Sequence, residues 1–296
     1  MTPVQRTVAG VPTRYLLDGP DGAPRVTFLH GGVPGVTPYC SGGHIWGASV
    51  APFLRDRRVL VPDLPGSGGT GLPSGSAPTI EAMVRHLAAL IDELAFRSCH
   101  IVGHDVGALV GLTLAIERPE LVRSVAIIAS AAAAPTGDMM QNLTLAHPPQ
   151  PLWSRESQAW ALERLSLSHL HIDDALVDAC VAAAAGAPHR QAAELLGGAG
   201  FRKLFVPSVG KAKARFFEVA RTTGMPVPVQ VVWATDDPLT TVEHGLWVFR
   251  LVAARQTATQ LHLVNRAGSF LFREQPARFH ELVAGFQDGL QREHNR

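Results

Sequence analysis

One glycine-flanked turn carries the side chain best placed for chemistry, Asp105. The segment Gly103-His104-Asp105-Val106-Gly107 directly follows the apolar run that begins at Cys99. Small residues two positions to either side permit a sharp, strained turn from a strand into a helix, and the central side chain then projects at the head of that helix. Helix amides and the helix dipole favour an anion there. The spacing predicts a nucleophile turn centred on Asp105; a glycine-rich turn of another α/β fold is the alternative.

An aspartate in this place implies different chemistry from a serine. A serine hydroxyl needs a base before it can attack a carbonyl group. A carboxylate is already ionised, and it can attack a saturated carbon to form an ester intermediate. Asp105 is therefore expected to be the catalytic centre.

Further segments repeat the same arrangement of a strand followed by a polar or glycine-rich loop. They are His30-Gly31-Gly32-Val33-Pro34-Gly35, Asp63-Leu64-Pro65-Gly66, Asp237 after the strand at 229–234, and Asn265-Arg266-Ala267-Gly268-Ser269-Phe270. In order and spacing these motifs resemble the α/β-hydrolase superfamily over residues 10–133 and 222–290. The branch they resemble most contains meta-cleavage-product hydrolases and epoxide hydrolases.

The resemblance implies roles for several positions. Amides near Gly32 and Val33, and the amide of Val106, would form an oxyanion hole. Asp237 would be the acid that orients a histidine. His30 would bind near the substrate or, as the preferred interpretation, pack the turn that it begins.

Aspartate at the nucleophile position resembles epoxide hydrolases and haloalkane dehalogenases, but both subgroups differ from this chain. Dehalogenases place tryptophan after the nucleophile, where this chain has Val106. Epoxide hydrolases use tyrosines of the lid, whereas the two tyrosines here, Tyr15 and Tyr39, lie outside it. Tyr39 could reach the substrate from its loop, although packing on the surface of the core is the preferred interpretation.

Ser269 occupies the position where the family has its catalytic histidine. A hydroxyl cannot act as a general base near pH 7, whereas an imidazole can. Either His244 or His262 replaces the base, or the serine is an introduced change, or the protein no longer hydrolyses its substrate. In the last case Asp105 would be the acid/base of a cofactor-independent lyase, isomerase or cyclase of secondary metabolism, or the protein would be an inactive ligand-binding relative.

The surrounding pattern predicts the elements that position these residues. Apolar runs at 26–30, 58–62, 99–103, 125–129, 229–234 and 260–264 alternate with helical stretches such as 79–95 and 106–117. Strands that are apolar throughout indicate a mostly parallel sheet covered by helices on both faces. We expect an eight-stranded α/β-hydrolase core over residues 1–133 and 222–296, with a helical cap over 134–221.

The cap sequence matches no pattern that identifies a substrate. Trp153 and Trp160 are seven residues apart, which would place them on one helix face, either lining an apolar pocket or packing on the core. A basic patch in the cap would attract a carboxylate or, as the preferred interpretation, form a solvated face; it comprises Arg202, Lys203, Lys211, Lys213 and Arg215.

Composition narrows the function classes. A net charge of +1 without a basic run argues against a nucleic-acid partner. Three widely spaced cysteines predict a reducing, cytoplasmic location, and no apolar run predicts a signal peptide or a membrane span. We expect a small hydrophobic substrate and neither a metal nor a cofactor; a homodimer is one oligomeric state that the sequence leaves open.

Overall fold

The computed structural model describes residues 1–136 and 143–294, and it contains one eight-stranded sheet. The strands are β1 (Pro3–Val8), β2 (Val11–Asp18), β3 (Arg25–Leu29), β4 (Arg58–Pro62), β5 (Cys99–His104), β6 (Val122–Ile128), β7 (Val229–Ala234) and β8 (Gln260–Val264). They are ordered β1-β2-β4-β3-β5-β6-β7-β8 across the sheet. The strands from β3 to β8 are parallel, and β2 is antiparallel to both of its neighbours. The fold is therefore the α/β-hydrolase fold that the sequence predicts.

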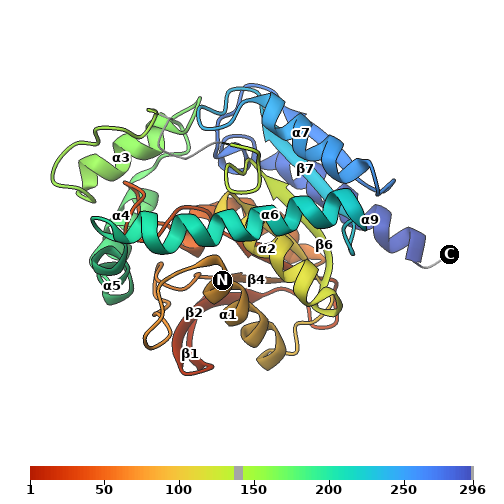
Figure 1. The fold of residues 1–296 in the computed structure, drawn as a ribbon, viewed down its shortest axis with the longest axis horizontal. Helices are drawn as coiled ribbons and strands as arrows, with labels where there is room; N and C mark the ends of the chain where they lie inside the picture. The colour runs from red at the N-terminus through yellow and green to blue at the C-terminus, as the bar shows by residue number, and fades with distance from the viewer. Residues whose placement is uncertain (137–142, 295–296) are drawn as a thin grey trace.

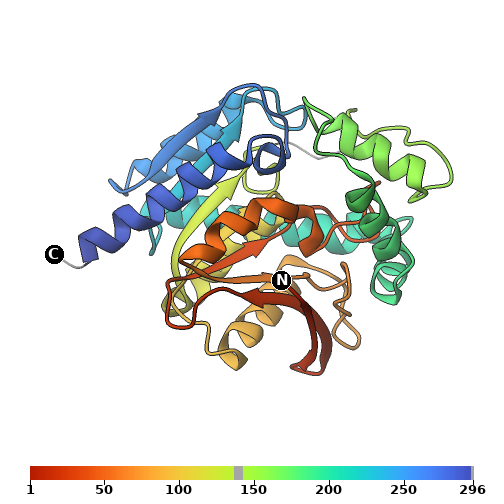
Figure 2. The ribbon, with the colours of Figure 1, turned by 180° about the vertical axis from the view of Figure 1, so that it is seen from behind.

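Helices cover both faces of the sheet. They are η1 (Gly43–Arg55), α1 (Ile80–Glu93), α2 (Val106–Glu117), η2 (Pro119–Leu121), α3 (Arg155–Arg164), α4 (Asp174–Ala184), α5 (Ala187–Leu196), η3 (Phe201–Phe205), α6 (Val206–Thr222), α7 (Val242–Ala253), α8 (Leu271–Glu274) and α9 (Pro276–His294). Helices α1, α2, α6 and α7 pack in one layer, in front of the sheet in Figure 1, whereas η1, α8 and α9 pack together on the other face, seen in Figure 2.

The alternation of strand side chains produces two separate apolar cores. Ile101 of β5 lies in the core beneath α1 and α2, and the next residue, Val102, lies in the core beneath η1 and α9. Successive side chains of a strand point to opposite faces of the sheet, so an apolar run is needed wherever both faces are covered. This is why the sequences of these strands are unbroken hydrophobic segments.

The segment between β6 and β7 supplies a helical cap at one end of the sheet. Helices α3, α4 and α5 lie beyond that end in both views (Figures 1 and 2). Helix α6 differs from them, because it runs back from the cap and packs against α1, α2 and α7. The predicted cap over 134–221 therefore includes a helix that belongs to the core layer.

Candidate active site

Asp105 sits at the apex of a strained turn between β5 and α2. Its φ of 45° lies in the left-handed region that side chains other than glycine seldom adopt. Both flanking glycines are required by close backbone contacts. A Cβ at Gly103 would lie 2.5 Å from Ala108 Cα, and one at Gly107 would lie 2.4 Å from Leu29 O. The turn thus has the tight geometry that the glycine spacing predicts.

Two backbone amides hold the Asp105 carboxylate. The amide of Gly32 donates to Oδ2 at 3.4 Å, and the amide of Ala132 donates to Oδ1 at 3.2 Å. The hydroxyl of Ser130 donates to the Asp105 carbonyl oxygen at 2.7 Å. These bonds fix the carboxylate between the loops that follow β3 and β6 and leave its side chain partly exposed.

The predicted oxyanion amides do not all have the same surroundings. Gly32, with a φ of 83°, presents its amide to Asp105, as noted above. The amide of Val33 instead donates to Thr37 Oγ1 at 2.7 Å, so the expectation that it faces the reacting group is wrong. Thr37 lies four residues further along and folds the loop back onto Val33. Val106 is buried at the first position of α2, where an amide has no partner within its own helix.

Asp237 and Ser269 form a buried pair at the carboxyl ends of β7 and β8. Ser269 Oγ donates to Asp237 Oδ1 at 2.6 Å. The same carboxylate accepts hydrogen bonds from the Leu239 amide at 2.9 Å and the Thr240 hydroxyl at 2.9 Å. Burial nevertheless raises the pKa of Asp237 above its ordinary value, against the opposing effect of these donors. The structure therefore places the Ser269 hydroxyl directly beside the Asp237 carboxylate.

The other histidines that the sequence brings forward are engaged elsewhere. His30 is buried; its Nε2 accepts the Leu64 amide at 2.9 Å and its Nδ1 lies 3.0 Å from Ser41 Oγ, which fits a residue that packs the turn. The ring of His244 caps α7 through Thr241, and His262 contacts Gln260 on the outermost strand. None of these contacts places an imidazole beside Asp237.

Tyr39 packs in the apolar core near Asp105, in agreement with the preferred interpretation of a loop aromatic that packs on the core. The residue is only 4% exposed, and its ring packs edge-on against Phe270 at 5.7 Å. Its hydroxyl lies 3.4 Å from where a Cβ of Gly32 would be. Burial raises the pKa of Tyr39 well above its usual value, and the charge of Asp105 adds to this effect. The phenol therefore stays protonated near neutral pH.

Trp153 contacts the loop after β3 rather than sharing a helix face with Trp160. It precedes α3 and has a φ of 64°, so the predicted i, i+7 helical relation is wrong. Its indole donates to Thr37 O at 2.9 Å, and its ring packs edge-on against His189. A small enclosed cavity beside this contact is lined by Tyr39, Cys40, Ala183 and His189, among others.

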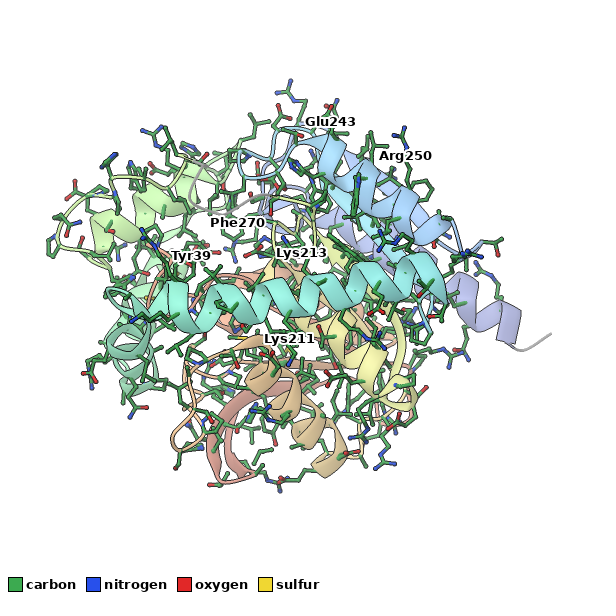
Figure 3. All side chains as sticks on the ribbon, in the orientation of Figure 1. Tyr39, Lys211, Lys213, Glu243, Arg250 and Phe270 are labelled. Carbon is green, nitrogen blue, oxygen red and sulfur yellow. The ribbon has the colours of Figure 1, made fainter. Side chains whose placement is uncertain are left out.

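Lys213 of α6, which the sequence places only within the basic patch of the cap, lies beside the loop that contacts Asp105. Its Nζ donates to Ala131 O at 3.3 Å and to Thr136 Oγ1 at 3.2 Å. Burial lowers the pKa of Lys213, and the charge of Asp105 opposes that shift. Figure 3 shows Lys213 and Lys211 on opposite edges of the same helix. Only the fold brings Lys213 close to Asp105, because the two residues lie 108 positions apart in the sequence.

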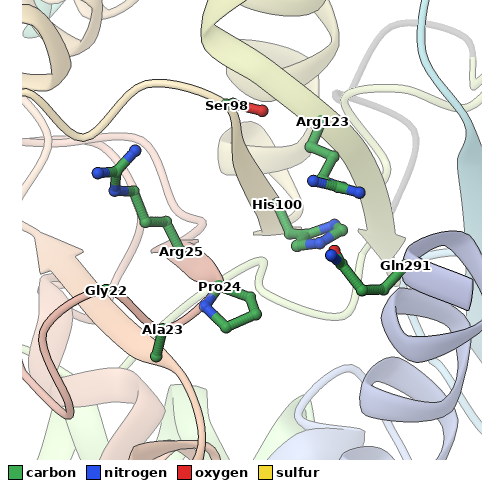
Figure 4. A pocket seen from close by; sticks show the side chains of 8 residues that line it. All are labelled: Gly22, Ala23, Pro24, Arg25, Ser98, His100, Arg123 and Gln291. Atoms are coloured by element: carbon green, nitrogen blue, oxygen red, sulfur yellow. The ribbon is translucent and has the colours of Figure 1, made fainter. Parts of the chain in front are cut away.

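A larger cavity of about 360 Å³ lies at the other end of the strands, beside the amino ends of β3, β5 and β6. Arg25, His100 and Arg123 line it, with Gln291 of α9 (Figure 4). Asp105 does not line this cavity. Within residues 1–136 and 143–294 no three His, Cys, Asp or Glu side chains are arranged to hold a metal ion, and no helix is long and apolar enough to cross a membrane.

Comparisons with known proteins agree with this architecture. A 2-hydroxy-6-oxo-2,4-heptadienoate hydrolase of Pseudomonas putida is 24% identical over 270 residues, which is 88% of each chain. A 2-hydroxymuconate semialdehyde hydrolase of a Pseudomonas species is 32% identical over 123 residues, 42% of this chain and 41% of the relative. The solved meta-cleavage product hydrolase of Pseudomonas fluorescens superposes with a TM-score of 0.76 at 22% identity and covers 97% of both chains.

A model of the alpha/beta hydrolase family matches residues 28–282, from β3 to the middle of α9. The matched range includes Asp105, Asp237 and Ser269 together with the whole cap. The chain therefore belongs to the alpha/beta hydrolase family, as an enzyme of that fold similar to meta-cleavage product hydrolases.

Proposed function

We propose that the protein opens a small hydrophobic organic electrophile by nucleophilic attack of Asp105, and that Ser269 makes release of the product slow. The observation that carries this proposal is the position of Asp105, a carboxylate at the apex of the strained turn with an amide on each oxygen. Of the substrate classes open to the scaffold, epoxides fit best, ahead of esters and C–C bonds, because a carboxylate attacks saturated carbon.

The first step needs no reactant other than the epoxide, Asp105 and Tyr39. An Asp105 oxygen bonds to a ring carbon, the carbon–oxygen bond of the epoxide breaks, and the Tyr39 hydroxyl gives its proton to the departing oxygen. The raised pKa of Tyr39 keeps that proton available until the alkoxide forms. The product of this step is an ester on Asp105.

The second step lacks its usual base. Release of the ester requires a water molecule that loses a proton as it attacks. The group beside Asp237 is the Ser269 hydroxyl, which donates to the carboxylate and accepts no proton near neutral pH. The ester on Asp105 should therefore accumulate, because its hydrolysis is slower than its formation.

Intact-mass measurement tests this function. The protein is incubated with a panel of epoxides, esters and vinylogous 1,5-diketones, beside Asp105→Asn as the matched variant. An added substrate mass on Asp105, absent from Asp105→Asn, supports nucleophilic attack. If Tyr39 protonates the leaving oxygen, Tyr39→Phe forms the epoxide adduct more slowly. No adduct with any member of the panel counts against the proposal.

Acid/base catalysis by Asp105 is the second candidate, and the Ser269–Asp237 hydrogen bond favours it. With a serine and no imidazole beside Asp237, no base would activate water, whereas the Asp105 carboxylate could still take a proton from substrate carbon or oxygen. Lyase, isomerase or cyclase chemistry of secondary metabolism needs only such a transfer. Product without an adduct, lost in Asp105→Asn, would select this candidate. Reversible binding alone would select an inactive ligand-binding protein.

A further inference from the structure

One peptide group, between Ala131 and Ala132, lies between a cation and Asp105. Its carbonyl oxygen accepts a hydrogen bond from Lys213 Nζ at 3.3 Å. Its N–H donates to Asp105 Oδ1 at 3.2 Å. The peptide is trans, since the cis bond among the described residues is Gln150–Pro151. The C=O and N–H of a trans peptide point in opposite directions, so ammonium, peptide and carboxylate form a continuous chain of two hydrogen bonds.

The turn that contains this peptide is fixed by further hydrogen bonds. Thr136 Oγ1 donates to the Ala131 oxygen at 3.0 Å and also accepts from Lys213 Nζ at 3.2 Å. Ser130 Oγ donates to Asp105 O at 2.7 Å and accepts the Ala133 amide at 2.9 Å. The carbonyl that Lys213 contacts is therefore held in place independently of Lys213.

Lys213 has a useful counterpart on its own helix. Lys211 is exposed and pairs with Glu81 of α1 at 3.5 Å, away from the site. Lys213 is half-buried and points toward the loop after β6. Figure 3 shows the two ends of these lysines on opposite edges of α6. Two lysines of one helix thus differ in whether they contact the Ala131–Ala132 peptide.

We propose that Lys213 is a positioning residue that acts on Asp105 through the Ala131–Ala132 peptide. A cation at the carbonyl oxygen draws electron density from the amide and makes its N–H a stronger donor, and linked hydrogen bonds strengthen one another by about 10–30%. The strengthened N–H holds the carboxylate in a fixed orientation. The inference rests on the proposed function, since this effect matters to a reaction only if Asp105 reacts.

The direct test is the NMR signal of the Ala132 amide in protein labelled with 15N-alanine. A weaker hydrogen bond moves the amide proton upfield, so Lys213→Met should move the Ala132 signal upfield. Lys213→Arg, which retains the cation, should restore it. Lys211→Met removes a positive charge from the same helix and should leave it unchanged. Asp105→Asn, which removes the charged acceptor, should also move it and so identify the signal.

Lys213→Gln provides a second neutral replacement that keeps a polar side chain, in case Lys213→Met does not fold. It should move the Ala132 signal in the same direction. An Ala132 signal that stays at its wild-type position in a folded Lys213→Met or Lys213→Gln protein would overturn the proposal. An equal movement in Lys211→Met would overturn it as well, because the effect would then be one of general charge.

Kinetics give an independent measurement. Adduct formation on Asp105 should slow about tenfold in Lys213→Gln, less than the about 10²–10³-fold loss typical of a deleted direct donor. The substrate concentration for half-maximal rate should not change, and Lys213→Arg should recover the rate. A wild-type rate in Lys213→Gln counts against the proposal. If even the wild-type protein forms no adduct, the proposed function fails, while the Ala132 signal still decides the role of Lys213.

Discussion

At the residue scale, the buried Asp237–Ser269 pair decides which proton transfers are open to the proposed mechanism. Asp237 keeps a full set of donors, with the Ser269 and Thr240 hydroxyls and the Leu239 amide all within 2.9 Å. The Ser269 hydroxyl in this arrangement does not accept a proton near pH 7. The buried charge of ionised Asp237 has an energetic cost, since burial raises the pKa of this carboxyl group.

Asp237→Asn should raise the thermal stability at neutral pH. Burial raises the pKa of Asp237 in the folded protein, so the ionised form destabilises the fold relative to the unfolded chain above that pKa. The penalty disappears as the pH falls and both states become protonated. An asparagine oxygen can accept the Ser269 and Leu239 hydrogen bonds, and its NH2 group can donate to the Thr240 hydroxyl oxygen, which reverses the direction of that bond. Melting temperatures measured from pH 8 to pH 4 should show a gain over wild type that shrinks with acid.

Asp236→Asn is the control for this prediction, since Asp236 is the exposed neighbour of Asp237. It should melt within about a degree of the wild type at each pH, as expected of a surface change. A gain for Asp237→Asn that is independent of pH would mean that the carboxylate is not the source of the penalty.

Several site residues could be predicted from the sequence because their positions depend on local geometry. Asp105 follows from glycines two residues away, whereas Asp237 and Ser269 are expected from the resemblance of the loops after their strands to the motifs of the family. Lys213 could not be predicted in this way. Its contact with Ala131 depends on α6 returning across the core, a tertiary relation that leaves no local signal in the sequence.

At the element scale, the turn from β5 into α2 is possible only because glycines allow the backbones to approach. Gly103 faces Ala108, and Gly107 faces the carbonyls of Leu29 and His30. The same closeness places the Asp105 side chain next to Gly31, where a Cβ would lie 2.7 Å from Asp105 Cβ. The strand, the helix and the loop after β3 are thus packed to backbone contact around Asp105.

Gly103→Ala should destabilise the protein by about 1–3 kcal/mol, the usual cost of an added methyl group in a close-packed place. The cost arises because the new methyl group would meet the backbone of Ala108, which cannot move without displacing α2. Urea unfolding measures the change. Gly210→Ala is the matched substitution on the exposed face of α6, where nothing lies within 4 Å of the new Cβ.

Gly210→Ala should stabilise the protein by about 0.5–1 kcal/mol through its higher helix propensity. Equal effects of the two substitutions would contradict the close packing around the turn.

The element boundaries follow the hydrophobic pattern closely where strands are buried on both faces. The predicted runs at 58–62, 229–234 and 260–264 coincide with β4, β7 and β8. The amino-terminal hairpin of β1 and β2 was not predicted, because β1 is exposed over most of its length and lacks a continuous apolar signal. The Trp153 error has a similar origin, since residue spacing alone does not tell where α3 begins.

At the scale of the whole molecule, a few buried or half-buried polar contacts attach the cap to the core. Gln158 of α3 accepts the Cys40 amide at 2.8 Å and donates to Trp153 O at 2.9 Å. On the other side, Glu274 accepts the amides of Ser168 and Gly268, both at 2.8 Å. These contacts join the cap to the loops after β3 and β8, which carry Gly32, Tyr39 and Ser269.

Gln158→Leu should loosen the cap without unfolding the sheet. Leucine has nearly the volume of glutamine but cannot bond to the Cys40 amide or the Trp153 carbonyl. Loss of the partner of the buried Cys40 amide alone costs about 1–3 kcal/mol. Limited proteolysis should cut the cap faster than in the wild type. Glu163→Gln, on the exposed side of the same helix, should leave the rate unchanged. A wild-type rate for Gln158→Leu would show that other contacts hold the cap.

The central claim is that Asp105 is the reacting group and that Ser269 arrests the reaction after it. Mass spectrometry of the Asp105 peptide during incubation with an epoxide that forms an adduct tests this claim most directly, in the wild type and in Ser269→His. The wild type should accumulate the ester, whereas Ser269→His should clear it and turn over repeatedly, with Asp237 orienting the new imidazole. An unlabelled wild-type peptide, or an ester that persists equally in Ser269→His, would contradict the account.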